Sequence, residues 1–269
     1  MHKFFMKKKF LVIGKPIEHS LSPELHNYWL KKNNIDAIYE KKKLEIKDIE
    51  NIISEVKENK LHGINVTVPY KKEIIPFLDE LSPEAKETQS VNTIYLQNGS
   101  TIGHNTDIAG FELAIKYAKY DISNKNIFIL GAGGVAPSII YSLKKLNASK
   151  ITLSNRTKEK AESLKVLFKD IEIVDWGTNI DFDMVINATS IGLNNAEEIK
   201  IDFSSSGPNK FFYDVIYNPR ETTFLKKAKL LGNKVENGKM MFIYQAHQSF
   251  TIWHKKMPKI DDETIELLD

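Results

Sequence analysis

The chain has 269 residues, of which 42% are hydrophobic and 27% charged, and its formal net charge at pH 7 is +3. This balance is ordinary for a soluble globular protein, and the length is sufficient for two modest domains. The absence of cysteine excludes disulfides, thiolate metal sites and cysteine nucleophiles, and the mild, scattered positive charge argues against a nucleic-acid partner.

The N-terminal segment is basic, and the apolar residues that follow predict a buried strand over 9–14. The apolar run 10–13 stops at Gly14 and no small-residue cleavage site follows, so we expect no export signal. Met6 is an alternative start, because the predicted strand begins only after it. No other run is long and apolar enough to span a membrane. We therefore expect a cytoplasmic protein with no membrane partner.

The first hundred residues alternate between apolar runs and amphipathic stretches. A helix is predicted to begin at Ser22 and Pro23, with Ser22 as its cap and Pro23 in the first helical position, and to end near 33–34. Asn98-Gly99 predicts the tight turn of a hairpin. Further elements are predicted as a strand over 37–44, a helix over 46–59 and a strand over 62–68.

The rest of the chain repeats a strand–helix alternation more regularly. Helices are predicted over 106–119 and 135–146, and strands over 126–130, 150–153, 171–174, 184–187 and 211–215. Such alternation predicts parallel sheets with both faces covered. We therefore predict two α/β domains: a substrate domain over 1–105 and a doubly wound, Rossmann-type nucleotide domain over 106–237. The helices from about 238 to 269, which carry Gln245 and Trp253, are expected to pack back on the first domain.

Residues 131–136 match the dinucleotide-binding pattern G-x-G-x-x-G/A between a predicted strand and a predicted helix. Gly131 permits the tight turn, and Gly133 lets the backbone approach a pyrophosphate. Ala136 keeps the helix close to the sheet, and the helix N-terminus supplies amide donors. The alternative interpretation is a glycine-rich turn that binds no ligand.

The end of the next strand discriminates between the two nicotinamide cofactors. An NAD-binding protein usually has an acidic residue there, but here the first carboxylate is Glu159. Arg156 stands instead where it can pair with a 2′-phosphate, with Asn155 and Thr157 beside it, so we expect NADP. Thr157 can also cap the next helix, but capping does not require Arg156. The segment 187–192 follows another strand, and it either touches the cofactor or is only a turn.

Small polar residues also cluster after the predicted strands of the first domain, in the segments 19–23, 65–71, 92–93 and 103–107. The carboxyl ends of strands form the binding edge of an α/β sheet. Individually these residues have ordinary explanations: Ser20, Ser22 and Asp107 can cap helices, and Lys71 can be one more surface lysine.

Taken together, the segments resemble the shikimate dehydrogenase family. They occur in the family's order and nearly span the chain: His-Ser-Leu-Ser-Pro at 19–23, Asn-Val-Thr-Val-Pro-Tyr-Lys at 65–71, Asn-Thr at 92–93, Asn-Thr-Asp at 105–107, Gly-Ala-Gly-Gly at 131–134, Asn-Arg-Thr at 155–157, Asn-Ala-Thr-Ser at 187–190 and Gln-Ala at 245–246. The resemblance implies reversible, NADPH-dependent reduction of 3-dehydroshikimate, a step of aromatic amino acid biosynthesis.

The resemblance also implies roles for individual residues. Lys71 and Asp107 are the implied catalytic pair, with Lys71 either an acid/base or an electrostatic group. Ser20 and Ser22 are the implied carboxylate ligands, and Thr67 and Asn92 the ligands of ring hydroxyls. The remaining implied substrate contacts are Asn65, Tyr217 and Gln245. The implied cofactor contacts are Gly131, Ala132, Gly133, Gly134, Val135, Asn155, Arg156, Thr157, Lys160, Thr189, Val215 and Gly238.

Other functions remain open at this point. The closest is a quinate/shikimate dehydrogenase that prefers NAD. A nucleotide-binding regulator of the same fold without activity is a second, and a methyltransferase with a similar glycine turn is a third. The seven histidines show no ligand spacing, so no metal is expected. A small-molecule substrate is the expected partner, and the protein is expected to be a monomer or a homodimer.

Overall fold

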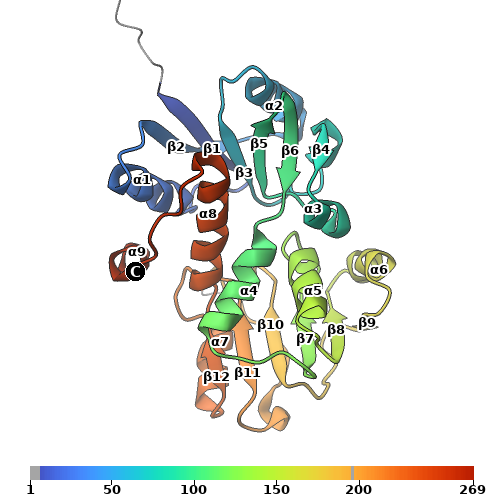
Figure 1. The fold of residues 1–269 in the computed structure, drawn as a ribbon. Coiled ribbons are helices and arrows are strands. Elements are labelled where there is room, and N and C mark those ends of the chain that lie inside the picture. The colour runs from blue at the N-terminus through green and yellow to red at the C-terminus, as the bar shows by residue number, and fades with distance from the viewer. Residues whose placement is uncertain (1–6, 195–196) are drawn as a thin grey trace, which may run out of the picture. The chain divides into compact units, whose positions relative to one another are not determined.

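Our computed structural model describes residues 7–194 and 197–269, and the chain divides into two units (Figure 1). The first unit holds the described residues up to Thr106 together with Gln245–Asp269, and the second holds Asp107–Tyr244. The alternative start Met6 lies outside the described residues. None of the helices formed by the described residues is long and apolar enough to cross a membrane.

The first unit is built on a six-stranded sheet with the order β2-β1-β3-β5-β6-β4 (Figure 1). Its strands are β1 (Lys8–Gly14), β2 (Ala37–Lys43), β3 (Gly63–Val66), β4 (Glu80–Leu81), β5 (Thr93–Gln97) and β6 (Ser100–His104). Its helices are α1 (Ser22–Lys32), η1 (Ile46–Asp48), α2 (Ile49–Lys57), η2 (Ile75–Phe77), α3 (Pro83–Thr88), the part of α8 (Lys239–His254) from Gln245 onward, and α9 (Asp262–Glu266).

This sheet is mixed, so the prediction of parallel sheets is wrong for the first unit. Strands β2, β1 and β3 are parallel, but β3 pairs with β5 and β5 with β6 in antiparallel fashion. The cause is the predicted hairpin, in which Asn98 and Gly99 adopt φ angles of 52° and 85° and reverse the chain between β5 and β6. The parallel trio still brings the carboxyl ends of β1, β2 and β3 to one edge.

The start of α1 differs from the prediction. Leu21 is the N-cap residue, and its side chain carries no hydrogen-bonding group, whereas Ser22 and Pro23 are the first two helical residues. Proline is tolerated there because the first helical N–H groups lack intrahelical acceptors in any case. Ser22 is therefore not needed as a cap, and its hydroxyl bonds to Ser20 instead.

The second half of α8 packs on the first unit's sheet through Trp253. Its indole ring lies 5.1 Å from the ring of Phe10, and its Nε1 donates a hydrogen bond to the Ile94 carbonyl at 3.1 Å. A Cβ atom on Gly63 would lie 2.3 Å from the indole, so glycine is required where the helix crosses β3.

The second unit contains a six-stranded sheet with the order β12-β11-β10-β7-β8-β9. Every neighbouring pair is parallel, which is the Rossmann arrangement of a doubly wound sheet (Figure 1). The strands are β7 (Asn126–Leu130), β8 (Lys150–Ser154), β9 (Glu172–Val174), β10 (Met184–Asn187), β11 (Phe211–Asp214) and β12 (Lys234–Glu236). The helices are α4 (Asp107–Tyr117), α5 (Ala136–Lys145), α6 (Lys158–Leu167), η3 (Ser204–Ser206), α7 (Thr223–Leu230) and the start of α8.

The predicted fold class is thus confirmed, with one strand of the second unit that the pattern did not reveal. β12 is only three residues long and has a charged residue at each end, so it shows no apolar periodicity. The strand order reverses between β7 and β10. In open α/β sheets, ligands bind at the carboxyl ends of the strands at such a switch point.

Candidate active site

The glycine turn after β7 lies at the switch point of the second unit. Gly131 has a φ of 106°, and its N–H donates to the Ser154 carbonyl at 2.8 Å. A Cβ atom there would lie 2.7 Å from Cγ2 of Thr189 and 2.9 Å from the backbone of Ala188. The loop after β10 therefore packs directly under this turn, and only glycine fits. Gly133 is exposed, and an added Cβ atom would meet only the Ala188 carbonyl oxygen, at 3.7 Å.

The loop after β10 is fixed by the amide of Asn187. Its Oδ1 accepts hydrogen bonds from the N–H and the hydroxyl of Thr189 at 3.0 and 2.7 Å. The Thr189 hydroxyl oxygen in turn accepts from the N–H of Ile191 at 3.0 Å. Thr189, a predicted cofactor contact, is thus held in place beneath Gly131.

A buried carboxylate supports this loop, and sequence reasoning missed it. Asp214 ends β11 and is fully buried, where Asn187 Nδ2 and the Ile216 N–H each donate to it at 3.0 Å and the Thr222 hydroxyl at 2.6 Å. Burial raises the pKa of Asp214 to about 6, although the hydrogen bonds from Thr222, Ile216 and Asn187 oppose this. The sequence does contain a sign of this carboxylate, because Asp214 is an acidic residue at the end of an otherwise apolar strand.

Three more predicted residues, Val215, Tyr217 and Gly238, lie in the segments after β11 and before α8. The Gly238 N–H donates to the Ile216 carbonyl at 3.0 Å, and a Cβ atom on Gly238 would lie 2.0 Å from the Val215 carbonyl oxygen. Glycine is therefore required at 238 by the backbone itself. The Tyr217 ring stacks on Phe242, with ring centroids 4.3 Å apart.

The residues predicted to bind a 2′-phosphate follow β8. Asn155 Oδ1 accepts from the Ala132 N–H at 3.0 Å and its Nδ2 donates to the Thr157 carbonyl at 2.7 Å, so this side chain joins the glycine turn to the end of β8. Thr157 is the N-cap residue of α6, but within the described part of the chain its hydroxyl forms no capping hydrogen bond. Arg156 and Lys160 are exposed.

These features fit an NADP cofactor. The glycine turn leaves an open backbone surface at Gly133, and α5 begins directly after it with the N-cap residue Val135, whose apolar side chain cannot cap the positive end of the helix. The exposed guanidinium of Arg156 and ammonium of Lys160 supply the positive charge that a 2′-phosphate requires. Lys158 is less available, because it pairs with Asp175 at 2.9 Å.

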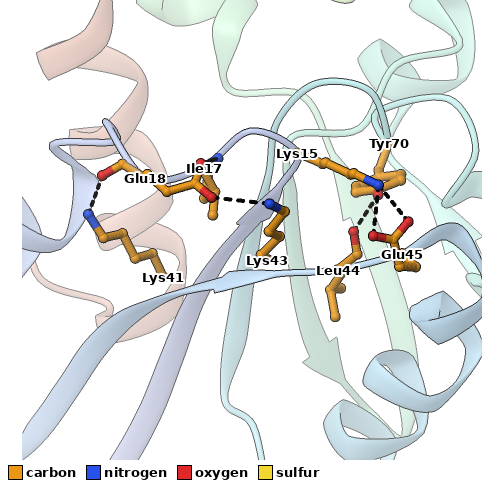
Figure 2. Close-up of polar contacts among 8 residues, drawn as sticks. All are labelled: Lys15, Ile17, Glu18, Lys41, Lys43, Leu44, Glu45 and Tyr70. Atoms are coloured by element: carbon orange, nitrogen blue, oxygen red, sulfur yellow. Dashed lines mark hydrogen bonds and ion pairs between the residues drawn. The ribbon is translucent and has the colours of Figure 1, made fainter.

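In the first unit, the loop after β1 carries Ser20 and Ser22. Ser20 Oγ donates to Ser22 Oγ at 3.2 Å. Glu18 fixes this loop: its carboxylate accepts from the Ile17 N–H at 2.9 Å and lies 3.3 Å from the ammonium of Lys43 (Figure 2). Hydrogen bonds from its own backbone N–H, from the Ile17 N–H and from the Lys43 ammonium lower the pKa of Glu18 to about 2. The two hydroxyls thus stand on an ordered loop.

Asn65 and Asn92 belong to one buried polar network. Asn65 Oδ1 accepts from the Tyr39 hydroxyl at 2.7 Å, and its Nδ2 donates to the Asn92 carbonyl at 3.0 Å and to Thr93 Oγ1 at 3.1 Å. Asn92 Oδ1 accepts from the Thr106 N–H at 2.7 Å. Since both amide protons of Asn65 are used within the protein, Asn65 can offer a ligand only an acceptor.

Lys71 lies in the turn after β3 and is buried. Its carbonyl accepts from the Val91 N–H at 2.8 Å, and Val91 directly precedes Asn92, just before β5 begins. Thr67 is half-buried, and its N–H donates to the Ile13 carbonyl at 2.9 Å. The network partners Tyr39, Thr93 and Thr106 were not among the predicted site residues, because their contacts cross between strands.

The remaining predicted residues lie on other elements. Asp107 is the first residue of α4 and opens the second unit, and Gln245 is the first residue of the part of α8 that belongs to the first unit. In residues 7–194 and 197–269, no three His, Asp or Glu side chains gather in a way that could hold a metal ion.

Comparison with known proteins identifies the family. A model described as the shikimate dehydrogenase substrate binding domain matches residues 12–94, and one described as shikimate / quinate 5-dehydrogenase matches residues 112–224. The chain belongs to the shikimate dehydrogenase family. The resemblance predicted from the sequence is thus confirmed, and each model falls within one of the two units.

Individual members of the family match nearly the whole chain. A curated relative from Pelagibacter ubique, named shikimate dehydrogenase (NADP(+)), is 59% identical over 264 residues, which cover 98% of this chain and 100% of the relative. The crystal structure of shikimate dehydrogenase from Aquifex aeolicus matches with a TM-score of 0.89 at 35% identity, covering 97% of each chain. The Thermus thermophilus enzyme, solved in complex with NADP(H) and shikimate, matches with a TM-score of 0.87 at 28% identity, covering 97% of this chain and 98% of that one.

Proposed function

We propose that this chain is an NADP-dependent shikimate dehydrogenase, which catalyses the reversible reduction of 3-dehydroshikimate to shikimate in aromatic amino acid biosynthesis. The observation that carries the proposal is the 59% identity to an NADP(+) shikimate dehydrogenase along that relative's entire length. The glycine turn with Arg156 in one unit and the polar residues around Lys71 in the other supply the chemistry that such a reaction requires.

The proposed chemistry separates a hydride from a proton. NADPH, when bound, supplies the hydride to the carbonyl carbon of the substrate. The carbonyl oxygen then needs a proton, and we assign the Lys71 ammonium as its donor; in the oxidation of shikimate, the neutral amine takes the hydroxyl proton back. A lysine in a buried turn can also stabilise the developing negative charge on the oxygen. Asp107 is proposed as the second catalytic residue.

The binding residues follow from the same proposal. Ser20 and Ser22 would donate hydrogen bonds to the substrate carboxylate, and Thr67 and Asn92 would hold ring hydroxyls, with Asn65, Tyr217 and Gln245 as further contacts. On the cofactor side, Arg156 and Lys160 would bind the 2′-phosphate. The backbone of the glycine turn would bind the pyrophosphate, and Thr189, Val215 and Gly238 would line the rest of the cofactor site.

A spectrophotometric assay tests the proposal directly. The purified protein is mixed with shikimate and NADP⁺ at alkaline pH, and the absorbance of NADPH is followed; parallel reactions contain NAD⁺, or quinate in place of shikimate. We expect kcat/KM to be at least about tenfold higher with NADP⁺ and shikimate than in either parallel reaction, a difference of about 1.4 kcal/mol in transition-state binding. No NADPH formation would refute the proposal, and a preference for NAD⁺ would refute the cofactor assignment.

Two further parts of the proposal concern the protein as a whole. We propose a cytoplasmic location, which fractionation of the source cells tests. We also propose that the protein is a monomer or a homodimer, and light scattering during size-exclusion chromatography distinguishes these from a larger assembly.

A further inference from the structure

Tyr70 directly precedes Lys71, and its side chain does more than fill the core. The ring is 3% exposed and packs in the apolar core of the first unit with Ile13, Leu44 and Ile74. Phenylalanine would fill the same space. The Tyr70 hydroxyl, however, donates a hydrogen bond to the Leu44 carbonyl at 2.5 Å within this core (Figure 2). The turn that carries Lys71 is thereby tied to the segment after β2.

The segment that receives this hydrogen bond is itself firmly held. Leu44 is buried, with 4% of its surface exposed. Glu45 is the N-cap residue of η1 and forms a capping box with Asp48, in which the Glu45 N–H donates to Asp48 Oδ2 at 3.1 Å. Leu44 and Glu45 therefore provide a fixed anchor rather than a loose loop.

Lys15 ties a third loop to the same anchor. Its ammonium lies 2.7 and 2.8 Å from the two carboxylate oxygens of Glu45 (Figure 2). Its backbone N–H donates to the Val68 carbonyl at 2.9 Å. Lys15 follows β1 and lies on the loop that continues to Ser20, whereas Val68 lies in the turn before Lys71. The loops after β1, β2 and β3 are thus joined at the edge where these parallel strands end.

We infer that Tyr70 is a positioning residue for Lys71. Its hydroxyl holds the turn that carries Lys71 on the Leu44–Glu45 segment, and Lys15 connects the loop after β1 to the same segment. This inference rests on the proposed function. The backbone on both sides of Lys71 is then fixed, because the Tyr70 N–H donates to the Thr67 carbonyl at 3.0 Å and the Lys71 carbonyl accepts from Val91 at 2.8 Å.

The Tyr70 hydroxyl remains a donor under the conditions of the assay. Burial raises the pKa of Tyr70 above its ordinary value of 10.0, and the nearby carboxylate of Glu45 raises it further, while the Lys15 ammonium acts in the opposite direction. The hydroxyl therefore keeps its proton at the moderately alkaline pH at which shikimate oxidation is measured.

Tyr70→Phe tests the inference, because it removes only the hydroxyl. With wild-type protein that oxidises shikimate with NADP⁺, we expect kcat to fall on the order of tenfold, since a small displacement of a catalytic group is costly, with KM for shikimate unchanged within about twofold. Tyr28→Phe is the matched control, because its hydroxyl donates to Glu263 at 2.9 Å in the same unit. In the reverse reaction, reduction of 3-dehydroshikimate, the primary isotope effect on kcat with NADPH deuterated at the transferred C4 hydrogen should also increase, which a general loss of stability would not cause.

Lys15 supplies an independent test if Tyr70→Phe folds poorly. Lys15→Met should lower kcat several-fold, and Lys15→Arg, which keeps the pairing with Glu45, should restore it. Lys57→Met is the control, because its pairing with Asp79 has the same 2.7 Å length and similar exposure. A wild-type kcat in both Tyr70→Phe and Lys15→Met would overturn the positioning role alone. So would losses of kcat in the controls Tyr28→Phe and Lys57→Met that equal those in the test variants. Wild-type protein that is inactive on shikimate would instead refute the proposed function, and the positioning role with it.

Discussion

The buried carboxylate of Asp214 makes a specific prediction about stability and pH. Burial raises its pKa from 3.8 to about 6 in the folded protein. Between these values the folded state holds a proton that the unfolded state has lost, so the free energy of unfolding falls as the pH rises. The shift is worth about 1.36 kcal/mol per pH unit, or about 3 kcal/mol in full. Because the unfolded carboxyl is already more than half ionised at pH 4, the free energy of unfolding should fall by about 2.4 kcal/mol between pH 4 and pH 7.

Asp214→Asn isolates this contribution, because the amide cannot ionise but its oxygen can still accept from Asn187 and Ile216. Urea denaturation of the two proteins between pH 4 and pH 8 gives the difference in their free energies of unfolding. We expect the wild type to lose stability relative to the variant as the pH rises, with no further change above about pH 7. Asp170→Asn is the control: pairing with Lys144 lowers the pKa of that exposed carboxylate, so it titrates below this pH range and its stability difference should stay nearly constant across it. A difference for Asp214→Asn that does not change with pH would refute the reasoning.

Three further substitutions test other parts of the structure. Arg156→Gln should weaken NADP⁺ binding roughly 10- to 100-fold, through loss of a charge-assisted hydrogen bond, and leave NAD⁺ binding unchanged in a fluorescence titration; equal losses for both cofactors would contradict the 2′-phosphate assignment. Gly131→Ala should lower the free energy of unfolding by roughly 1–3 kcal/mol and weaken NADP⁺ binding. Gly99→Ala is its control, because Gly99 also has a positive φ but a Cβ atom there would meet no described residue within 4 Å; equal losses of stability and binding would argue against the close approach under the glycine turn. Trp253→Phe should cost about 1–2 kcal/mol in urea denaturation, because the hydrogen bond from the indole to the Ile94 carbonyl is lost, and an unchanged midpoint would contradict that role.

Local patterns predicted the second unit of the fold well. The strands 126–130 and 184–187 are found with the predicted bounds, because apolar runs between turn residues mark buried parallel strands clearly. The glycine turn was predicted from its motif between a strand and a helix, and Gly131 has the positive φ and the close backbone approach that only glycine allows. β12 was not predicted, because three residues with charged ends carry no periodic signal.

The supporting contacts of the candidate site could not be predicted in the same way. Asn65 is bonded to Tyr39 across β1, and Tyr70 to the Leu44 carbonyl, through pairings between segments more than 25 residues apart. A sequence motif indicates which side chains react or bind, but the contacts that hold them depend on strand register. The cap at Ser22 was predicted wrongly for a related reason, because the helix begins one residue earlier than the Ser-Pro pair suggests.

Lys71→Ala is the most direct test of the account. We expect kcat for shikimate oxidation to fall on the order of 10²- to 10⁴-fold, the contribution typical of a positioned proton donor, while the dissociation constants for shikimate and NADP⁺ change little. Lys72→Ala, at the neighbouring exposed lysine, should behave as the wild type. A Lys71→Ala protein that turns over shikimate at the wild-type rate would contradict the account.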